Sequence, residues 1–318
     1  MTLITLLIVL TIERISATGQ LWQFDFYYQK LKSLMLNHLG RPQWLESQIG
    51  RWVWILLPVL VIAFLSNALD WLLFEFVFDV LVLLICIGCV KQRKLYKSFL
   101  NAANRGDDEA CQLYAAQLRG LEVVQTQQDE TDNTAVVNED EQSAEVEQSE
   151  PVATEPAGTE QGPCENCSLG QTLVWFNFRY YCAVLFWFVS LGPAGAVLYC
   201  MVRESADDSD HSISELFTDN QLDKALHILD WLPARVCTAG YLLIGHFTKS
   251  AGIWLSYLLD FTSSAKDLVS KIANAAESID LGDCSNTTEP ACMLKLAKRN
   301  VLFFLAMVAL LTLYGGIK

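Results

Sequence analysis

The segment "WFNFRYYCAVLFW", residues 175–187, places an amide, Asn177, and a guanidinium, Arg179, among aromatic and aliphatic side chains. An arginine in the middle of a membrane helix costs about 2.5–3.5 kcal/mol on insertion scales, so such residues are usually paired or functional. A second arginine, Arg203, follows four residues after Tyr199. Arginine binds carboxylates and phosphates through two parallel hydrogen bonds. All four side chains are candidates for binding an anionic ligand.

A second group of polar residues lies in "LDKALHILDWLPAR", residues 222–235. Asp223, His227 and Asp230 share one helix face at spacings of four and three. The stripe could hold a metal ion, but we favour the alternative, the polar face of an amphipathic helix with leucines opposite. We predict no metal, and we add His227, Asp230 and Arg235 to the candidate ligand-binding residues.

Two acidic residues, Glu75 and Asp79, lie four apart in an otherwise apolar run and share a helix face. A charge within a membrane is usually paired with an opposite one. We therefore predict that Arg179 pairs with Glu75 or Asp79. In the alternative structural interpretation, Arg179 extends to the lipid headgroups beside Tyr180 and Tyr181.

Long apolar runs are the elements that would position these residues, and hydrophobic residues make up 52% of the 318-residue chain. A membrane helix needs about 20 mostly apolar residues. We predict an all-α, multi-pass helical bundle of four to five spans in a lipid bilayer, with further cytoplasmic helices. The runs are 1–12 (a short span or a packed helix), 52–69, 71–90, 182–202 and 301–317. Pro193 is expected to kink one span rather than to turn a re-entrant hairpin.

The acidic residues are concentrated in residues 122–170, which contain 13 Asp or Glu and neither Lys nor Arg. The rest of the chain is close to neutral, although the formal net charge is −14. This stretch cannot bury enough apolar surface to offset its chain entropy, so we predict a disordered linker. It separates an N-terminal membrane half (1–121) from a C-terminal one (171–318). An acidic tether repels nucleic acid, which we exclude as a partner.

Basic residues flank the predicted helical hairpin 52–90 on both sides, and its central turn has none. Lys and Arg are enriched in cytoplasmic loops. Both flanks and the linker 122–170 are therefore expected in the cytoplasm. Residues 203–300 have no such bias, so their side of the membrane stays open.

The ten cysteines and the motif content give little sign of enzymatic chemistry. Cys164 and Cys167 form a lone CxxC without further zinc ligands at a matching spacing. Cys284 and Cys292 flank a polar loop, where they could be paired or free. Signature motifs of soluble enzymes are absent, so no catalytic residue and no cofactor are predicted.

The chain resembles the AmpE family of bacterial inner-membrane proteins. The resemblance covers both halves outside the acidic linker. It is carried by "MTLITLLIVLTIER", "WFNFRYYCAVLFW", "GPAGAVLY", "HILDWLPAR" and the final "LLTLYGG". It implies an inner-membrane protein with a signalling role in β-lactamase induction and cell-wall recycling.

A more distant resemblance is to the CobD/CbiB membrane proteins of cobalamin biosynthesis. These proteins use ATP to join an amino-alcohol to a carboxylate of the corrin ring. Matching positions are Gly106, Asp107 and Ala110, then Ala183, Leu185, Phe186 and Trp187, then Gly192, Gly195, Ala196 and Tyr199, then Leu232, Pro233, Ala234 and Arg235. Several carboxylates expected of that family are missing, with Asn177 and Arg179 at one such place. Because amine and metal contacts need carboxylates, this argues against corrin chemistry.

Two functions follow from these resemblances. The first is a non-enzymatic regulator that responds to an anionic ligand, either wall-derived or lipid-linked. The alternative is a membrane-embedded ligase or transferase on a CobD/CbiB-like scaffold with a different substrate. The protein partner is not predicted.

Overall fold

The computed structural model describes residues 2–16, 22–39, 48–68, 71–120, 168–207, 221–258, 260–277 and 288–315. Every regular element within these ranges is a helix, which confirms the predicted all-α fold. The first half contains α1 (Thr2–Ser16), α2 (Phe24–Leu39), α3 (Gln48–Ala68), α4 (Leu72–Cys86), α5 (Val90–Arg105) and α6 (Asp108–Arg119). The second half contains α7 (Leu169–Asn177), a π-helical turn (Phe178–Cys182), α8 (Ala183–Ala206), α9 (Gln221–Ile244), α10 (Phe247–Tyr257), α11 (Ala265–Glu277) and α12 (Thr288–Leu313).

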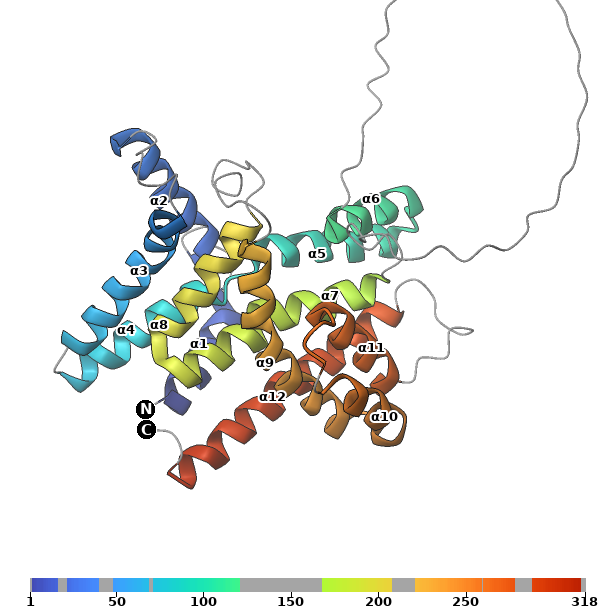
Figure 1. Ribbon diagram of the computed structural model, residues 1–318. Coiled ribbons are helices and arrows are strands. Elements are labelled where there is room, and N and C mark those ends of the chain that lie inside the picture. The colour runs from blue at the N-terminus through green and yellow to red at the C-terminus, as the bar shows by residue number, and fades with distance from the viewer. Residues whose placement is uncertain are drawn as a thin grey trace, which may run out of the picture.

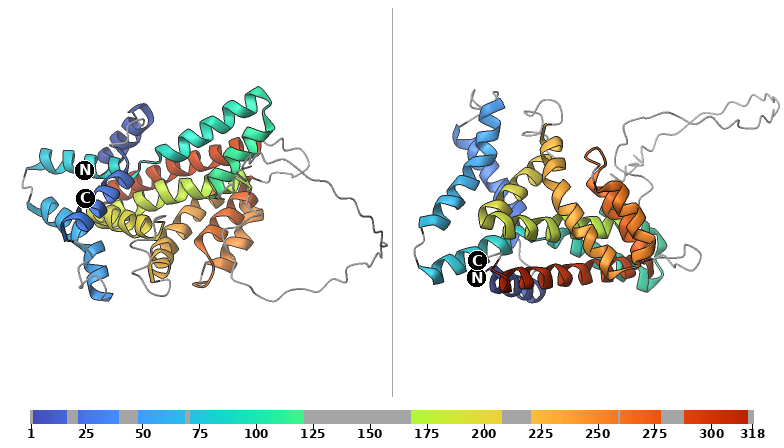
Figure 2. Two further views of the ribbon diagram at one scale, coloured as in Figure 1. Left: turned by 90° about the horizontal axis from the view of Figure 1, so that it is seen from above. Right: turned by 60° about the horizontal axis from the view of Figure 1, so that its bottom comes forward.

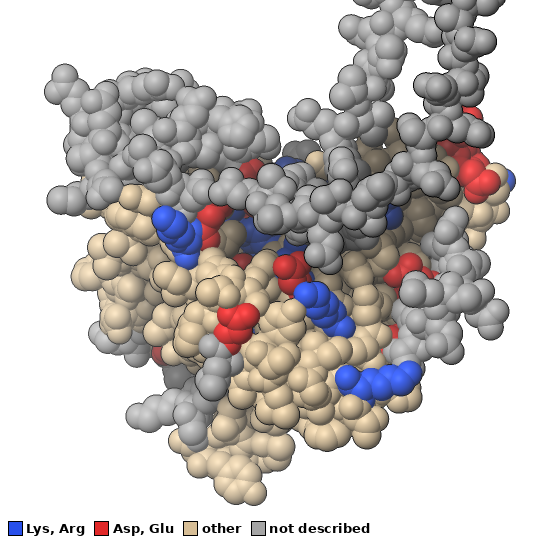
Figure 3. All heavy atoms as spheres, turned by 45° about the vertical axis from the view of Figure 1, so that its right-hand side comes forward, with Lys and Arg blue, Asp and Glu red and all other residues tan. Residues whose placement is uncertain are grey.

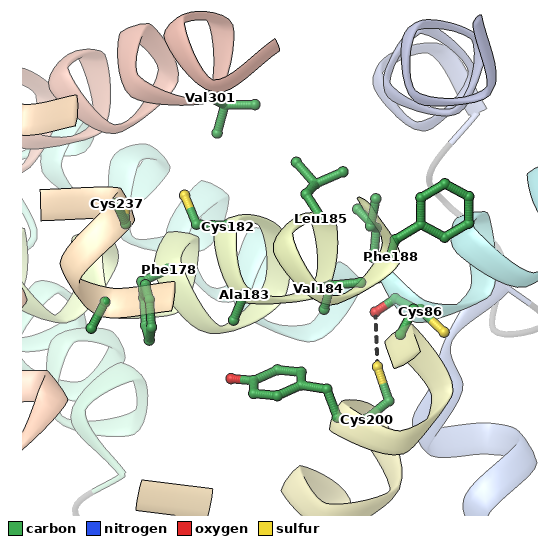
Figure 4. Packing of buried hydrophobic residues seen from close by; sticks show 14 of the residues in the cluster. Cys86, Phe178, Cys182, Ala183, Val184, Leu185, Phe188, Cys200, Cys237 and Val301 are labelled. Atoms are coloured by element: carbon green, nitrogen blue, oxygen red, sulfur yellow. Dashed lines mark hydrogen bonds between the residues drawn. The ribbon is translucent and has the colours of Figure 1, made fainter. Parts of the chain in front are cut away.

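The helix that begins at Leu169 forms the centre of the bundle (Figures 1 and 2). Helix α12 and helix α11 pack on α7, while α3, α4 and α9 pack on α8. Figure 4 shows this central helix between Val301 of α12 and Cys86 of α4. Both halves of the chain therefore share one hydrophobic core, which extends from Leu6 to Val308.

Helix α8 is broken at Gly192, whose φ of 72° and ψ of −161° are not helical, and Pro193 follows. Arg179 and Asp207 form an ion pair of 2.9 Å across this break. In a straight helix these residues would lie about 42 Å apart at 1.5 Å per residue. The segment is thus a helical hairpin with its turn at Gly192, and our expectation of one kinked span is wrong. Glycine can adopt the positive φ that the turn requires.

Helix α7 begins at Leu169, inside the segment predicted to be linker. The Ser168 hydroxyl accepts a hydrogen bond from the Gln171 amide, and the Gln171 side chain accepts one from the Ser168 amide. This capping box satisfies donors that would otherwise be unpaired at the helix start. The remainder of the predicted linker, residues 122–167, lies outside the described residues.

Helices α5 and α6 form a corner at Gly106, which has a φ of 70°. The Asp107 carboxylate caps α6 by accepting from the Ala110 amide at 3.0 Å. A Ser/Asp cap of this kind contributes about 1 kcal/mol to helix stability. The positions that resembled a CobD/CbiB motif therefore have a local structural role here.

By length and composition, two segments of the described ranges could cross a membrane: Leu169–Ala206, which is the hairpin broken at Gly192, and Glu289–Leu313. A third is possible if Leu73–Cys86 and Val90–Arg105, which meet at 48°, form one bent span. Residues Thr2–Glu13 and Trp52–Ala68 are shorter apolar helices. On the face in Figure 3, most of the described surface carries neither basic nor acidic side chains. A multi-pass membrane protein is the architecture that fits these helices.

Candidate functional site

The π-helical turn Phe178–Cys182 interrupts the central helix one residue after Asn177. Turns of this kind are rare and occur frequently at functional sites. The turn carries three consecutive polar side chains, Arg179, Tyr180 and Tyr181, and each contacts a different part of the molecule. These contacts define the candidate site.

Arg179 donates from Nη1 to the Asp207 carboxylate at the end of α8. Its Nε and Nη2 atoms are buried and have no hydrogen-bond partner among the described residues. The guanidinium lies 5.8 Å from the centre of the Trp175 ring. The Nε–Nη2 edge of this guanidinium therefore has no hydrogen-bond acceptor among the described residues.

The predicted partners of Arg179 lie elsewhere. Glu75 is exposed on α4, and the Asp79 Oδ1 atom is buried without a hydrogen-bond partner in the described part of the chain. The pair predicted from sequence is therefore replaced by Arg179–Asp207. The reason is the turn at Gly192, which brings the end of α8 back to the π-helical turn.

Arg203 is fully buried and lies beside Arg179. It donates from Nη2 to the Glu204 carboxylate at 2.8 Å and from Nη1 to the backbone carbonyl of Arg179 at 3.2 Å. Its guanidinium also lies 4.3 Å from the centre of the Tyr180 ring. The stacking and the carbonyl bond fix the second leg of the hairpin against the π-helical turn.

Asp230 of α9 joins the same cluster through Tyr199, whose hydroxyl donates to the carboxylate at 2.7 Å. Burial raises the pKa of Asp230 to about 6, while the positive charge of Arg179 and the Tyr199 hydrogen bond act in the opposite direction. Tyr199, Arg203, Arg179 and Asp230, all predicted from sequence, are therefore brought together by the fold.

Tyr180 and Tyr181 connect the turn to the N-terminal half. The Tyr181 hydroxyl donates to Glu13 of α1 at 2.7 Å and contacts Arg93 of α5, which is also ion-paired with Glu13. The Tyr180 hydroxyl accepts from Gln92 at 3.0 Å. We call Glu13, Gln92, Arg93, Tyr180 and Tyr181 the junction network.

Sequence reasoning missed the junction network. The available signal was Glu13, a lone acid at the end of an apolar run, because a buried charge of this kind requires a partner. Its partner Arg93 is one of the basic residues that follow the predicted hairpin 52–90, where it indicates only a side of the membrane. Nothing in the linear sequence indicates that residues 13, 93 and 181 meet.

Arg235 has a different environment from Arg179. Its guanidinium donates to backbone carbonyls of Trp231, Tyr257, Leu258 and Asp260, and lies 4.2 Å from the centre of the Trp231 ring. The side chain thereby closes the end of α10. Its donors are used within the protein, so the structure does not place Arg235 in a ligand site with Arg179.

The remaining candidates are also engaged locally. The His227 Nε2 atom is hydrogen-bonded to the Phe261 carbonyl at 2.9 Å, and the Phe261 ring stacks on Trp231. The Asn177 side-chain oxygen, Oδ1, accepts from the Cys182 thiol at 3.9 Å. Neither residue contacts the Arg179 cluster through a described hydrogen bond.

Within the described ranges, no group of three or more His, Cys, Asp or Glu side chains could hold a metal ion. The described cysteines are free thiols, Cys292 included. Cys164, Cys167 and Cys284 lie outside the described residues.

A cavity of about 790 Å³ opens beside the π-helical turn, between the two halves of the chain. Its charged lining includes more bases than acids. The bases are Lys91, Arg119, Arg179 and Lys266, and the acids are Asp25, Glu204 and Asp207. A volume of this size is typical of a small-molecule site.

Comparison with known proteins gives one family. The family model for "Regulatory signalling modulator protein AmpE" matches residues 1–140 and 137–318. This chain belongs to the AmpE family. The Protein AmpE of Shigella flexneri is 27% identical over 331 residues, which cover all of both chains. No solved structure matches. Membership extends over the whole chain, so the AmpE resemblance predicted from sequence is confirmed.

Proposed function

We propose that this AmpE-family protein modulates β-lactamase induction and cell-wall recycling from the inner membrane, in response to an anionic ligand that is wall-derived or lipid-linked. It acts as a regulator rather than as an enzyme, with the basic flanks of residues 52–90 in the cytoplasm. The ligase alternative receives no support from the family match.

The junction network is the observation that carries the proposal. It joins three elements, α1, α5 and the π-helical turn, through partly buried polar contacts as well as through apolar packing. Buried polar networks specify one arrangement of the groups that share them. A regulator needs two arrangements whose balance a ligand can shift. A polar junction between two halves, adjacent to a cavity, is suited to that role.

The test uses cells that lack the gene and carry an inducible chromosomal β-lactamase. They are complemented with the natural chain or with Glu13→Gln, which removes the charge from the junction network. We expect the natural chain to restore induction and Glu13→Gln to lower it, at equal protein level in the membrane. The measurement is β-lactamase activity after a sub-inhibitory dose of β-lactam, beside an immunoblot.

Glu109→Gln is the matched control, because it makes the same Glu-to-Gln change at an exposed position on α6. It should induce normally. If the gene-deleted host induces β-lactamase as strongly as cells that carry the natural chain, the proposed function is overturned. Normal induction by Glu13→Gln at an equal protein level would instead overturn the role of the junction.

A further inference from the structure

The cavity beside the π-helical turn contains cations that no described residue neutralises. Of its three acids, Asp25 is ion-paired with Lys91, and Asp207 with Arg179. Glu204 is ion-paired with Arg203. Arg119 of α6 and Lys266 of α11 are left without a carboxylate partner among the described residues.

Unused hydrogen-bond donors point to the same cavity. The Nε atom of Arg119 is buried and has no hydrogen-bond partner in the described ranges. The same holds for the Nε and Nη2 atoms of Arg179. Nε and Nη2 form one edge of a guanidinium, the edge that pairs with two oxygens of a single anion. The side chain of Arg179 is 11% exposed. Because unsatisfied buried donors are rare in folded proteins, two such arginines lining one cavity point to an acceptor that the described residues do not supply.

The charge of that acceptor follows from the cations. Two unpaired positive charges, on Arg119 and Lys266, call for an anion of charge close to −2. A phosphate monoester has this charge near neutral pH and offers three terminal oxygens. A single carboxylate has only half the charge and two oxygens. Phosphate is therefore the better match to the lining.

We propose that this cavity binds a phosphate monoester group, with Arg119, Arg179 and Lys266 as its ligands. The proposal rests on the proposed function and deepens it, because it gives the anionic ligand a site and a chemical class. The group could belong to a soluble phosphate ester or to a lipid headgroup. Since Arg119 and Lys266 come from opposite halves of the chain, the bound group would also hold the two halves together.

The experiment uses the full-length protein and has two arms. In detergent, thermal unfolding is followed during titration with inorganic phosphate and with glycerol 3-phosphate. In vesicles, it is compared between phosphatidylcholine alone and phosphatidylcholine containing phosphatidic acid, whose headgroup is a phosphate monoester. A rise in Tm in the first arm identifies a soluble ligand, and a rise in the second arm alone identifies a lipid headgroup.

The variants Arg119→Gln and Lys266→Gln assign the effect to the cavity. Each removes one charge-assisted contact, so we expect the affinity for the active probe to fall by about tenfold to hundredfold. Lys97→Gln is the matched control, because Lys97 is exposed on α5 and does not line the cavity. Arg179→Gln also removes the ion pair with Asp207, so the test does not depend on it.

The absence of a Tm rise with every probe would overturn the proposal. So would a rise that Arg119→Gln and Lys266→Gln leave at the level of Lys97→Gln. Both results come from purified protein and leave the induction assay unaffected. A failed regulatory function would instead show as normal induction in the gene-deleted host, with phosphate binding intact.

Discussion

Arg235 and Arg179 are both motif arginines that the fold buries, but they are satisfied in different ways. Arg235 donates to four backbone carbonyls and stacks on Trp231. Arg179 has one carboxylate partner, which is 44% exposed, and one unpaired edge beside a cavity. A saturated guanidinium stabilises the fold, whereas a half-saturated one retains capacity for a ligand. The presence of an arginine in a motif does not distinguish a structural arginine from a ligand-binding one. The hydrogen bonds that its guanidinium makes do distinguish them.

The largest effect is expected at Arg235. Arg235→Leu removes the charged donor from four carbonyls of half-buried residues, and a lost hydrogen bond to a charged group typically costs about 1.5–3 kcal/mol. We expect a fall of about this size in the free energy of unfolding, measured on the purified protein by thermal or denaturant unfolding. Arg235→Lys should not rescue it, since one ammonium group cannot reach four carbonyls. Rescue by lysine would contradict the capping role.

Asp230 gives the next largest effect, and it depends on pH. Its pKa is raised to about 6 by burial, against 3.8 for the ordinary group. The folded state therefore binds the proton more tightly than the unfolded state. Its stabilising contribution is complete below about pH 4 and is lost as pH rises through 6, by roughly 1–3 kcal/mol in total.

Asp230→Asn should remove this part of the pH dependence of Tm, while Asp223→Asn, an exposed residue on the same helix, should leave it unchanged. The Tm of the parent and of each variant is measured between pH 4 and pH 7. Equal slopes in the parent and in Asp230→Asn would contradict the assignment.

Arg179→Leu should cost less than Arg235→Leu, at most about 1 kcal/mol, because the Asp207 partner is largely solvated and the lost edge makes no hydrogen bond. The measurement is again the free energy of unfolding. Adding Asp79→Leu or Glu75→Leu to Arg179→Leu should restore nothing, since neither acid contacts Arg179. Restoration by either double change would support the pairing first predicted from sequence.

The smallest effect is expected for deletion of residues 125–165, which leaves both arginines in place. From its acidic, aromatic-free composition, this segment is expected to bury little apolar surface. We expect unchanged membrane insertion and a Tm equal to that of the parent. A large loss of either would show that this segment contributes to the folded bundle.

Much of the fold follows from hydrophobic runs, because burial in a bilayer constrains composition strongly. The helical class and the apolar segments around residues 52–90 and 301–317 were predictable for that reason. The hairpin turn was not, since Gly192 and Pro193 suit a kink as well as a reversal. Candidates near the turn, such as Tyr199 and Asp230, were found through their unusual polarity. Asp207 and Glu13, the partners of Arg179 and Tyr181, were not found, because the linear sequence does not show which distant segments meet.

The turn at Gly192 also bears on how many times the chain crosses the membrane. A helix that enters the membrane and then returns adds no net crossing, so we predict that positions 168 and 207 lie on the same side of the membrane. Counting this segment as one crossing would invert the side assigned to everything that follows, from α9 to the start of α12. Labelling of single cysteines introduced at positions 168 and 207 should therefore give the same sidedness.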